Sequence, residues 1–124
     1  MTPKRKVTKH IVNGDTEKTQ LGIMVMDAPG AGGANHAYDI HDYYGYDLCR
    51  INFQKGPIKE QGVNGITQEA LLAICADRLE SFQAGSFACE DNAEALLHIQ
   101  KALNCLKKRT TDRIARNVEG ENKL

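Results

Sequence analysis

Basic residues gather near the C-terminal end of the chain, between Lys101 and Arg116. This segment holds six cations and a single acid, Asp112. Arginine guanidinium groups donate paired hydrogen bonds to phosphate oxygens and stack on nucleobases. The segment therefore predicts a site for a phosphate-bearing ligand.

The arginines continue an apolar helical stripe. In steps of three and four residues, the stripe reads Asn92, Leu96, Ile99, Leu103, Leu106, Arg109, Arg113 and Arg116. An unpaired charge is costly to bury on such a face, so the arginines need an anionic partner. Acidic side chains of another subunit and an anionic ligand both meet that need, and the stripe leaves both open.

Phe82 and Asn92 offer matching chemistry for a nucleotide at the other end of the same hairpin. An aromatic ring stacks on a base, and an amide bonds a base or ribose edge. By rise alone, Asn92 and Arg113 lie about 30 Å apart in one helix. Only an antiparallel second copy would join the two ends, so the pattern predicts a dimer with composite pockets. The plainer interpretations, Phe82 as core and Asn92 as a helix-start residue, are left open.

A glycine-rich segment offers a second, weaker signal for phosphate. Gly32 and Gly33 would let backbone N–H groups approach an anion, with Asn35 and His36 following directly. The segment lacks the Gly-Lys-Ser/Thr ending of a nucleotide-binding P-loop, and no helical pattern follows it. A flexible hairpin loop is an equally good interpretation.

No catalytic or metal-binding constellation emerges from the histidines and cysteines. The four histidines lack metal-ligand spacing, and no cysteine has a histidine in a recognisable arrangement. We therefore expect neither an enzyme nor a metal or cofactor. Cys75 and Cys105 fall on apolar helical stripes and are expected to be buried free thiols, as in a reducing cytosol.

The elements that must position these residues change character near residues 62–67. Before that point, β-prone segments alternate with glycine-rich turns, including Asn13 with Gly14 and Tyr44 with Gly45. The expected strands are residues 6–12, 22–26, 36–43 and 47–54. After it, the hydrophobic period is near 3.6 residues. The prediction is an α+β fold, with a small antiparallel sheet in residues 1–62 and a two-helix hairpin in residues 63–124, packed as one compact domain.

The first helix is expected to begin at Thr67, which can cap it, and to stop before Gly85. Its expected buried face is Ala70, Leu71, Ile74, Cys75, Leu79 and Phe82. The second helix is expected to begin around residues 89–91 and to end near Val118, with Gly120 as breaker.

Composition narrows the function classes. Sixteen basic residues balance sixteen acidic ones, so the chain has no net positive charge that would attract it to nucleic acid or to a membrane surface. Residues 1–9 are basic and polar, and no stretch reaches 18 apolar residues, so neither a signal peptide nor a membrane span is expected. With no Trp and few aromatic residues the core is thin, which favours a homo-oligomer.

Several segments resemble one phage family, the Thoeris anti-defence nucleotide sponges, whose helical hairpin is shared with anti-CBASS sponges. The segments are residues 32–36, 52–60, 62–65, 78–83, 87–89, 92–93, 108–110 and 113–120. The last of these is the most specific. The resemblance covers roughly residues 30–120.

The resemblance implies a protein of the host bacterial cytoplasm that binds a cyclic ADP-ribose isomer and releases it unhydrolysed. It implies dimers or hexamers and, in some relatives, separate sites for cyclic di- or trinucleotides. Phe82 would stack on adenine, Asn92 would bond a base or ribose, and Arg109 and Arg113 would clamp the pyrophosphate. The loop from Gly32 to His36 would close over the ligand. A small nucleic-acid-binding module is the alternative from another class.

Overall fold

The computed structural model describes residues 5–116. The chain divides into two compact units. Among the described residues, the sheet unit comprises 5–56 and 63–65, and the hairpin unit comprises 57–62 and 66–116. Residues 57–62 thus belong with the helices. The expectation that both regions pack into one compact domain stays a prediction.

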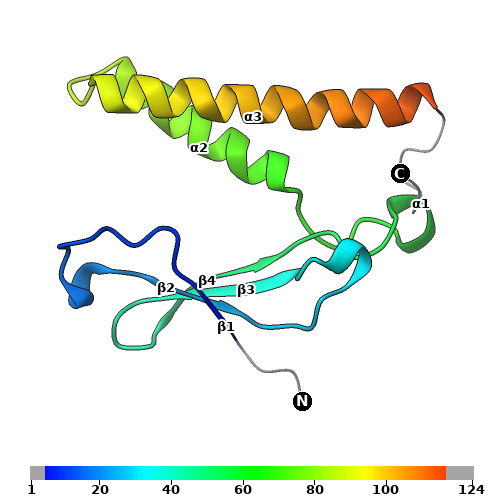
Figure 1. The fold of residues 1–124 in the computed structure, drawn as a ribbon, viewed down its shortest axis with the longest axis horizontal. Coiled ribbons are helices and arrows are strands. Elements are labelled where there is room, and N and C mark those ends of the chain that lie inside the picture. The colour runs from blue at the N-terminus through cyan, green and yellow to red at the C-terminus, as the bar shows by residue number, and fades with distance from the viewer. Residues whose placement is uncertain (1–4, 117–124) are drawn as a thin grey trace. The chain divides into compact units, whose positions relative to one another are not determined.

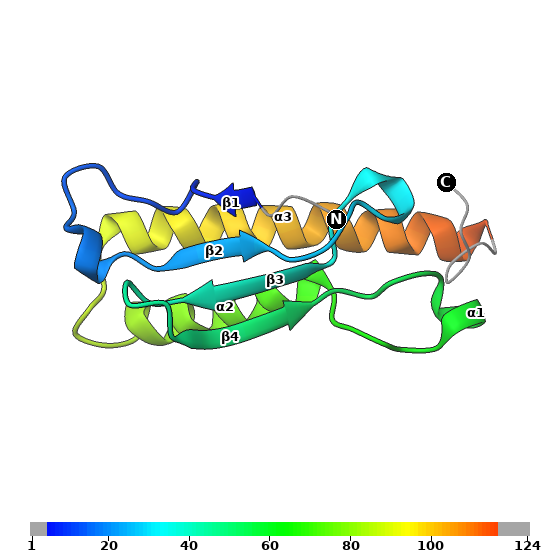
Figure 2. The same cartoon turned by 90° about the horizontal axis from the view of Figure 1, so that it is seen from below.

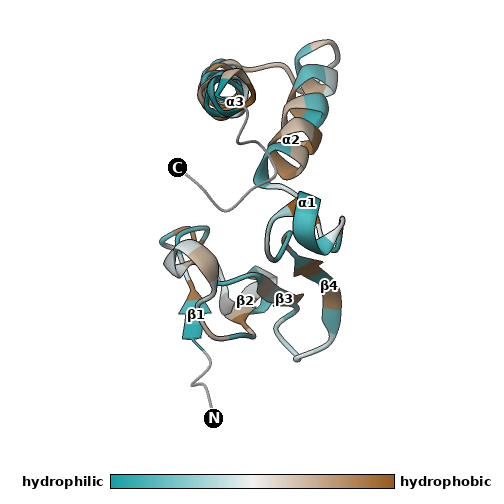
Figure 3. Cartoon of the chain, turned by 90° about the vertical axis from the view of Figure 1, so that its right-hand side faces the viewer, coloured by the Kyte–Doolittle hydropathy of each residue, from teal (hydrophilic) through white to brown (hydrophobic). Residues whose placement is uncertain are grey.

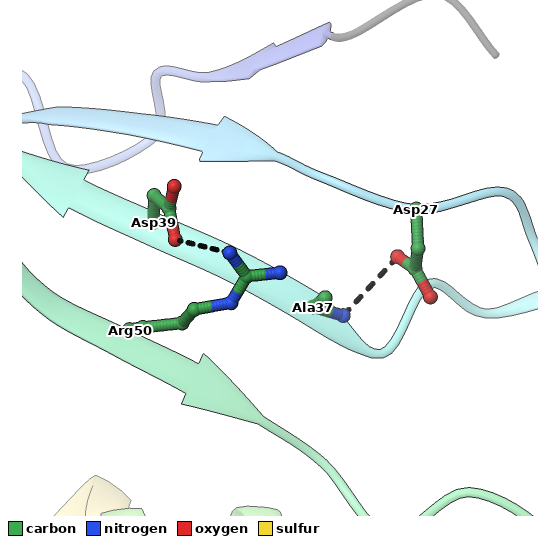
Figure 4. Close-up of polar contacts among 4 residues, drawn as sticks. All are labelled: Asp27, Ala37, Asp39 and Arg50. Carbon is green, nitrogen blue, oxygen red and sulfur yellow. Dashed lines mark hydrogen bonds and ion pairs between the residues drawn. The ribbon is translucent and has the colours of Figure 1, made fainter. Parts of the chain in front are cut away.

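The sheet unit is built on a four-stranded antiparallel sheet in the order β1-β2-β3-β4 (Figures 1 and 2). The strands are β1 (Arg5–Val7), β2 (Gly22–Val25), β3 (Ala37–His41) and β4 (Asp47–Asn52). Val25, 3% exposed, is the buried centre of the sheet. The ion pair between Asp39 of β3 and its register partner Arg50 of β4 spans 3.7 Å (Figure 4). The predicted α+β order of a sheet followed by helices is confirmed.

The predicted extent of the first strand, residues 6–12, is wrong. β1 ends at Val7, because Thr8 begins a turn in which its carbonyl accepts the N–H of Ile11 at 3.1 Å. The predicted turn at Asn13 and Gly14 between the first two strands is confirmed, and it lies within a long connection from β1 to β2 that also holds the 3-10 helix η1 (Glu17–Thr19).

The turn between β3 and β4 is confirmed. Gly45 has a φ of 89°, a conformation that a glycine adopts without strain, and its N–H donates to the Asp42 carbonyl at 3.1 Å. The Asp42 carboxylate accepts the N–H groups of Tyr44 and Tyr46, both at 2.9 Å. Asp42 thus fixes the hairpin tip from both sides of the glycine.

The hairpin unit contains α1 (Ile58–Gln61), α2 (Gln68–Gln83) and α3 (Glu90–Ala115). The predicted cap of α2 is confirmed, because the Thr67 hydroxyl accepts the N–H of Ala70 at 3.1 Å. α3 starts after Cys89 as expected but ends at Ala115, before Val118. Val118 and Gly120 lie outside the described residues. The sequence pattern missed α1, a single turn closed by Gly62, which is too short to show a hydrophobic period.

The predicted buried face of α2, which packs against α3, is partly right. Leu71, Leu79 and Phe82 are half-buried as expected, but the buried centre is Ala76, 6% exposed, with Leu72 half-buried one turn before it. Ala70, Ile74 and Cys75 are exposed, so their assignment to the core is wrong; Cys105 of α3 is exposed too. Hydrophobic residues lie on more than one side of α2 (Figure 3), so the period alone fits two faces. Within residues 5–116, no helix is long and apolar enough to cross a membrane.

Candidate functional site

The C-terminal end of α3 carries a basic hollow of about 410 Å³. Its lining within the described residues is Cys105, Lys108, Arg109, Asp112, Arg113 and Arg116. The structure therefore brings together the three arginines that the sequence singled out. Arg113 is the one charged side chain among the described residues that is buried, at 9% exposure.

The predicted stripe needs one correction at this end. The half-buried positions of α3 continue from Leu103 and Leu106 to Thr110 and then Arg113, while Arg109 and Arg116 are exposed. Each helical residue turns about 100°, so Arg109 lies about 60° from Leu106, whereas Arg113 lies only about 20° from it. Two successive steps of three residues, from Leu103 to Leu106 and on to Arg109, turn away from the buried face of the helix. Arg113 continues the buried stripe, and Arg109 flanks it.

The single acid of the hollow is already engaged. Lys108 Nζ donates to Asp112 Oδ2 at 2.9 Å, one helical turn apart. The hydrogen bond to Asp112, and next its negative charge, raise the pKa of Lys108 above its usual range. Within the described residues, the side chains of Arg109 and Arg116 have no hydrogen bond or ion pair. The hollow thus presents guanidinium donors that an anion can use.

The other predicted pair, Phe82 and Asn92, lies where α2 turns into α3. The Phe82 ring is half-buried, with the Arg78 guanidinium carbon 5.4 Å from its centroid. The Phe87 ring lies 5.9 Å from it at 50°. Asn92 Nδ2 donates to the Phe87 carbonyl at 3.2 Å. This bond fixes the orientation of the amide and directs its nitrogen at the segment that connects α2 to α3. Both plainer interpretations are therefore partly realised, since Phe82 packs and Asn92 braces the helix start.

Sequence reasoning missed Arg78 and Phe87 as neighbours of Phe82. The spacing of Arg78, four residues before Phe82, is the signal that could have found the first, since such pairs are neighbours on a helix. Cys89 also contributes, because its N–H donates to Gln83 Oε1 at 3.0 Å and its sulfur accepts the N–H of Asn92 at 3.4 Å. These bonds make the connection between the helices a fixed element.

The two ends of the hairpin do not meet within one chain. α3 is one uninterrupted helix from Glu90 to Ala115, visible along its length in Figure 1. Asn92 and Arg113 are therefore separated by about 30 Å of helix, as the rise per residue predicts. The hairpin therefore carries two separate groups of the residues that the sequence singled out, one with an aromatic ring and an amide, the other cationic.

The glycine-rich segment belongs to the sheet unit and is held by one carboxylate. Asp27 accepts the N–H of Ala37 at 3.1 Å (Figure 4) and the N–H of His36 at 3.0 Å. Asn35 Nδ2 donates to the Asp27 carbonyl at 2.7 Å, and Arg5 donates to Asn35 Oδ1 at 2.8 Å. Desolvation raises the pKa of Asp27, but the N–H groups of Ala37 and His36 outweigh it, so the pKa lies below its ordinary value of 3.8.

The tip of this loop uses the glycines for their backbone freedom. Gly32 and Gly33 have φ values of 74° and 81° inside the short 3-10 turn η2 (Ala31–Gly33). His36 Nδ1 is buried and has no hydrogen-bond partner among the described residues. A buried polar nitrogen without a partner is costly, which makes His36 the loop residue most in need of a ligand or water. No group of three metal-ligating side chains occurs in the part of the chain that the structure describes.

Comparison with known proteins supplies the family. The sequence model of the Acb2/Tad1 hairpin domain matches residues 46–111, which is more than half of the chain. The chain belongs to this family. Its resemblance to the Thoeris anti-defence proteins of phages is therefore confirmed at the level of the family.

One relative matches a longer part of the chain than the hairpin model does. The protein named Thoeris anti-defense 1, from Bacillus phage SBSphiJ7, is 42% identical over 91 residues. The alignment covers 73% of this chain and 63% of that relative. The hairpin match includes Phe82, Asn92 and Arg109, and it stops just before Arg113.

Proposed function

We propose that this chain is a phage anti-defence protein that binds a cyclic ADP-ribose-type signal in the host cytoplasm and withholds it without cleaving it. The observation that carries the proposal is the arginine hollow on α3, where Arg113 is buried beside Arg109 and Arg116. Membership of the Acb2/Tad1 hairpin family and the name of the relative Thoeris anti-defense 1 support the anti-defence role.

The arginines are suited to a pyrophosphate. Guanidinium groups bond phosphate oxygens in pairs, and Asp112 does not neutralise Arg109 because it pairs with Lys108. The C-terminal end of a helix repels anions, so the arginines must also outweigh the helix dipole. Three of them on adjacent turns provide that positive charge.

The complete site lies between two copies of the chain. Phe82 and Asn92 would hold the base and ribose from one copy, and Arg109 and Arg113 would clamp the phosphates from an antiparallel partner. Two copies are needed because Asn92 and Arg113 of one chain lie about 30 Å apart along α3, and a dinucleotide-sized ligand cannot span that distance. Exposed apolar residues on the hairpin, including Ile74 and Leu97, offer surface for such an assembly as a dimer or hexamer.

The loop carrying Gly32, Gly33, Asn35 and His36 completes the proposal as a cover for the ligand. Positive φ values at both glycines turn the backbone, and His36 Nδ1 has an unused hydrogen-bonding position. We propose that this loop contributes less to the binding free energy than the arginines do.

Recovery of the ligand tests sequestration against catalysis. The protein is incubated with a lysate in which Thoeris immunity has been activated, is then purified and heat-denatured, and the released small molecule is measured by mass spectrometry. An intact cyclic ADP-ribose isomer is the expected result. A linear or cleaved product would identify an enzyme, and recovery of nothing from the wild-type protein would overturn the proposal.

The same experiment separates the alternative ligands. Cyclic di- or trinucleotides released from a lysate with active CBASS immunity would identify a sponge for those signals instead. Binding of random oligonucleotides with a steep salt dependence would identify a nucleic-acid-binding module. The net charge of zero argues against that last function.

A further inference from the structure

One residue of the arginine hollow is not explained by a phosphate clamp, and that residue is Asp112. The hollow lies at the C-terminal end of α3, drawn in orange in Figure 1. Asp112 is the one acid among the lining residues that the structure describes. A carboxylate repels phosphate, so a site for phosphate alone would bind its ligand more tightly without Asp112. The presence of this acid therefore requires another reason.

The stability of the helix does not provide that reason. Asp112 lies in the last turn of α3, where the negative end of the helix dipole disfavours a carboxylate. Lys108 precedes Asp112 by four residues, which is the less favourable order for such a pair. Their side chains are 78% and 58% exposed, and an exposed ion pair contributes little to folding. Asp112 therefore adds little to the stability of α3.

The pair with Lys108 makes the carboxylate compatible with the arginines. Lys108 Nζ donates to Asp112 Oδ2 at 2.9 Å, which compensates the negative charge. A carboxylate has two oxygens with about four lone-pair positions, so this bond leaves further acceptor positions on Asp112. An ionised carboxylate accepts hydrogen bonds and donates none. Asp112 thus offers a ligand an acceptor, which a hydroxyl group can use and a phosphate oxygen cannot.

Asp112 lies close to the guanidinium groups that are proposed to bind phosphate. It follows Arg109 by three residues and precedes Arg116 by four, so each arginine is its neighbour on the helix surface, with Cβ atoms about 5–6 Å apart. In a nucleotide, the 2′ and 3′ hydroxyls are likewise only a few covalent bonds from the 5′-phosphate. A ribose phosphate can therefore place its phosphate at the arginines and a hydroxyl at Asp112.

We propose that Asp112 is a specificity-determining residue of the hollow, which accepts a hydrogen bond from a ribose hydroxyl of the nucleotide whose phosphates the arginines hold. This inference rests on the proposed function and narrows its ligand class to ribose 5′-pyrophosphates. A ligand without the hydroxyls loses the hydrogen bond and keeps the repulsion between its phosphates and the carboxylate. Asp112 therefore selects against deoxyribose compounds and against bare pyrophosphate.

A matched pair of nucleotides isolates the ribose hydroxyls. ADP and 2′,3′-dideoxy-ADP have the same base and the same pyrophosphate, and they differ only in those hydroxyls. Inorganic pyrophosphate is the third probe, because it has the anion without base or ribose. Binding of each probe to the full chain is titrated at neutral pH and constant ionic strength, and is followed by the backbone amide NMR resonances of residues 105–116.

The wild-type protein should bind ADP about tenfold more tightly than 2′,3′-dideoxy-ADP, as expected for a hydrogen bond to a charged acceptor. Asp112→Ala should bind the two nucleotides equally. It should bind pyrophosphate about two- to fivefold more tightly than the wild-type protein does, because a repelling charge is removed and Lys108 is released. Misfolding would not produce this combination, since it would weaken the binding of every probe.

Two further variants separate the hydrogen bond from the charge. Asp112→Asn keeps an oxygen acceptor and removes the charge, so it should keep part of the preference for ADP and bind pyrophosphate more tightly. Asp91→Ala removes the same charge from an exposed position in the first turn of α3 and should change neither property. Both Asp112 variants should unfold at the temperature of the wild-type protein or above it, because the helix dipole disfavours the carboxylate.

Two results would overturn the proposal. One is a preference for ADP over 2′,3′-dideoxy-ADP that is absent from the wild-type protein or unchanged in Asp112→Ala. The other is nucleotide binding that leaves the resonances of residues 105–116 unmoved. The proposed nucleotide sponge has its own test, because release of an intact signal from the wild-type protein supports sequestration whether or not Asp112 selects for a hydroxyl.

Discussion

The guanidinium carbon of Arg78 lies 5.4 Å from the centroid of the Phe82 ring, one helical turn along α2. A cation over an aromatic face is attracted by the electron density of the ring. Together with Phe87, whose centroid is 5.9 Å away, Arg78 holds Phe82 in a fixed orientation. The ring proposed to stack on a base is thus oriented before any ligand arrives.

Phe82→Leu should weaken binding of cyclic ADP-ribose by about 1–3 kcal/mol, because leucine keeps the packing but loses stacking. Arg78→Ala should cost less, about 0.5–1 kcal/mol, because it removes only the cation above the ring. Titration calorimetry measures both changes, with Glu80→Ala as a control on an exposed position of α2. An unchanged affinity of Phe82→Leu for cyclic ADP-ribose would mean that Phe82 has a purely structural role.

Arg109→Ala should cost about 1.5–3 kcal/mol of ligand affinity, the value of a hydrogen bond to a charged group. Its free energy of unfolding should change by less than about 0.5 kcal/mol, because Arg109 is exposed and has no partner among the described residues. Lys107→Ala, the exposed neighbouring cation, is the matched control for net charge.

The same Arg109 variant distinguishes a ligand role from a structural one. Size-exclusion chromatography with light scattering should find the same assembly as in the unsubstituted protein. Dissociation of the oligomer in Arg109→Ala, without dissociation in Lys107→Ala, would instead identify an ion pair between subunits.

Ala76→Leu should destabilise the protein by about 1–3 kcal/mol, because the larger side chain does not fit where α2 meets α3. Ile74 is 58% exposed, so Ile74→Ala should cost far less in a dilute monomer. Urea unfolding monitored by circular dichroism compares the two. The reverse order would mean that α2 packs with the other of its two apolar faces.

Asp27 gives the sheet unit a specific acid sensitivity. Its folded-state pKa is below the ordinary 3.8, so its carboxylate stabilises the fold fully above that value. This stabilisation is lost as the pH falls through the folded-state pKa. Urea unfolding between pH 6 and pH 2 should show that loss in the unsubstituted protein and a flatter profile in Asp27→Asn.

Asp77→Asn is the control for this profile, because Asp77 is exposed on α2. It should leave the pH dependence of unfolding as it is. An unchanged profile in Asp27→Asn would mean that the N–H groups of His36 and Ala37 do not stabilise the carboxylate.

Local features of the fold follow from the sequence because their causes are local. Thr67 caps α2 through an N–H three residues away, and Gly45 turns the chain between β3 and β4. The change from glycine-rich alternation to a 3.6-residue period predicted a sheet followed by helices. The distance between Asn92 and Arg113 also needed only the rise of a helix.

The choice of faces needed the tertiary structure. α2 has apolar residues on two sides, and only packing against α3 selects Ala76 over Ile74. After Leu106, steps of three and four are equally good helical spacings, one leading to Arg109 and the other to Thr110. The half-buried and buried positions take Thr110 and then Arg113, because alternating steps of four and three keep a residue on the same face of the helix. The sequence thus determined that arginines end the seam, and only the folded structure decided that Arg113, and not Arg109, is the buried one.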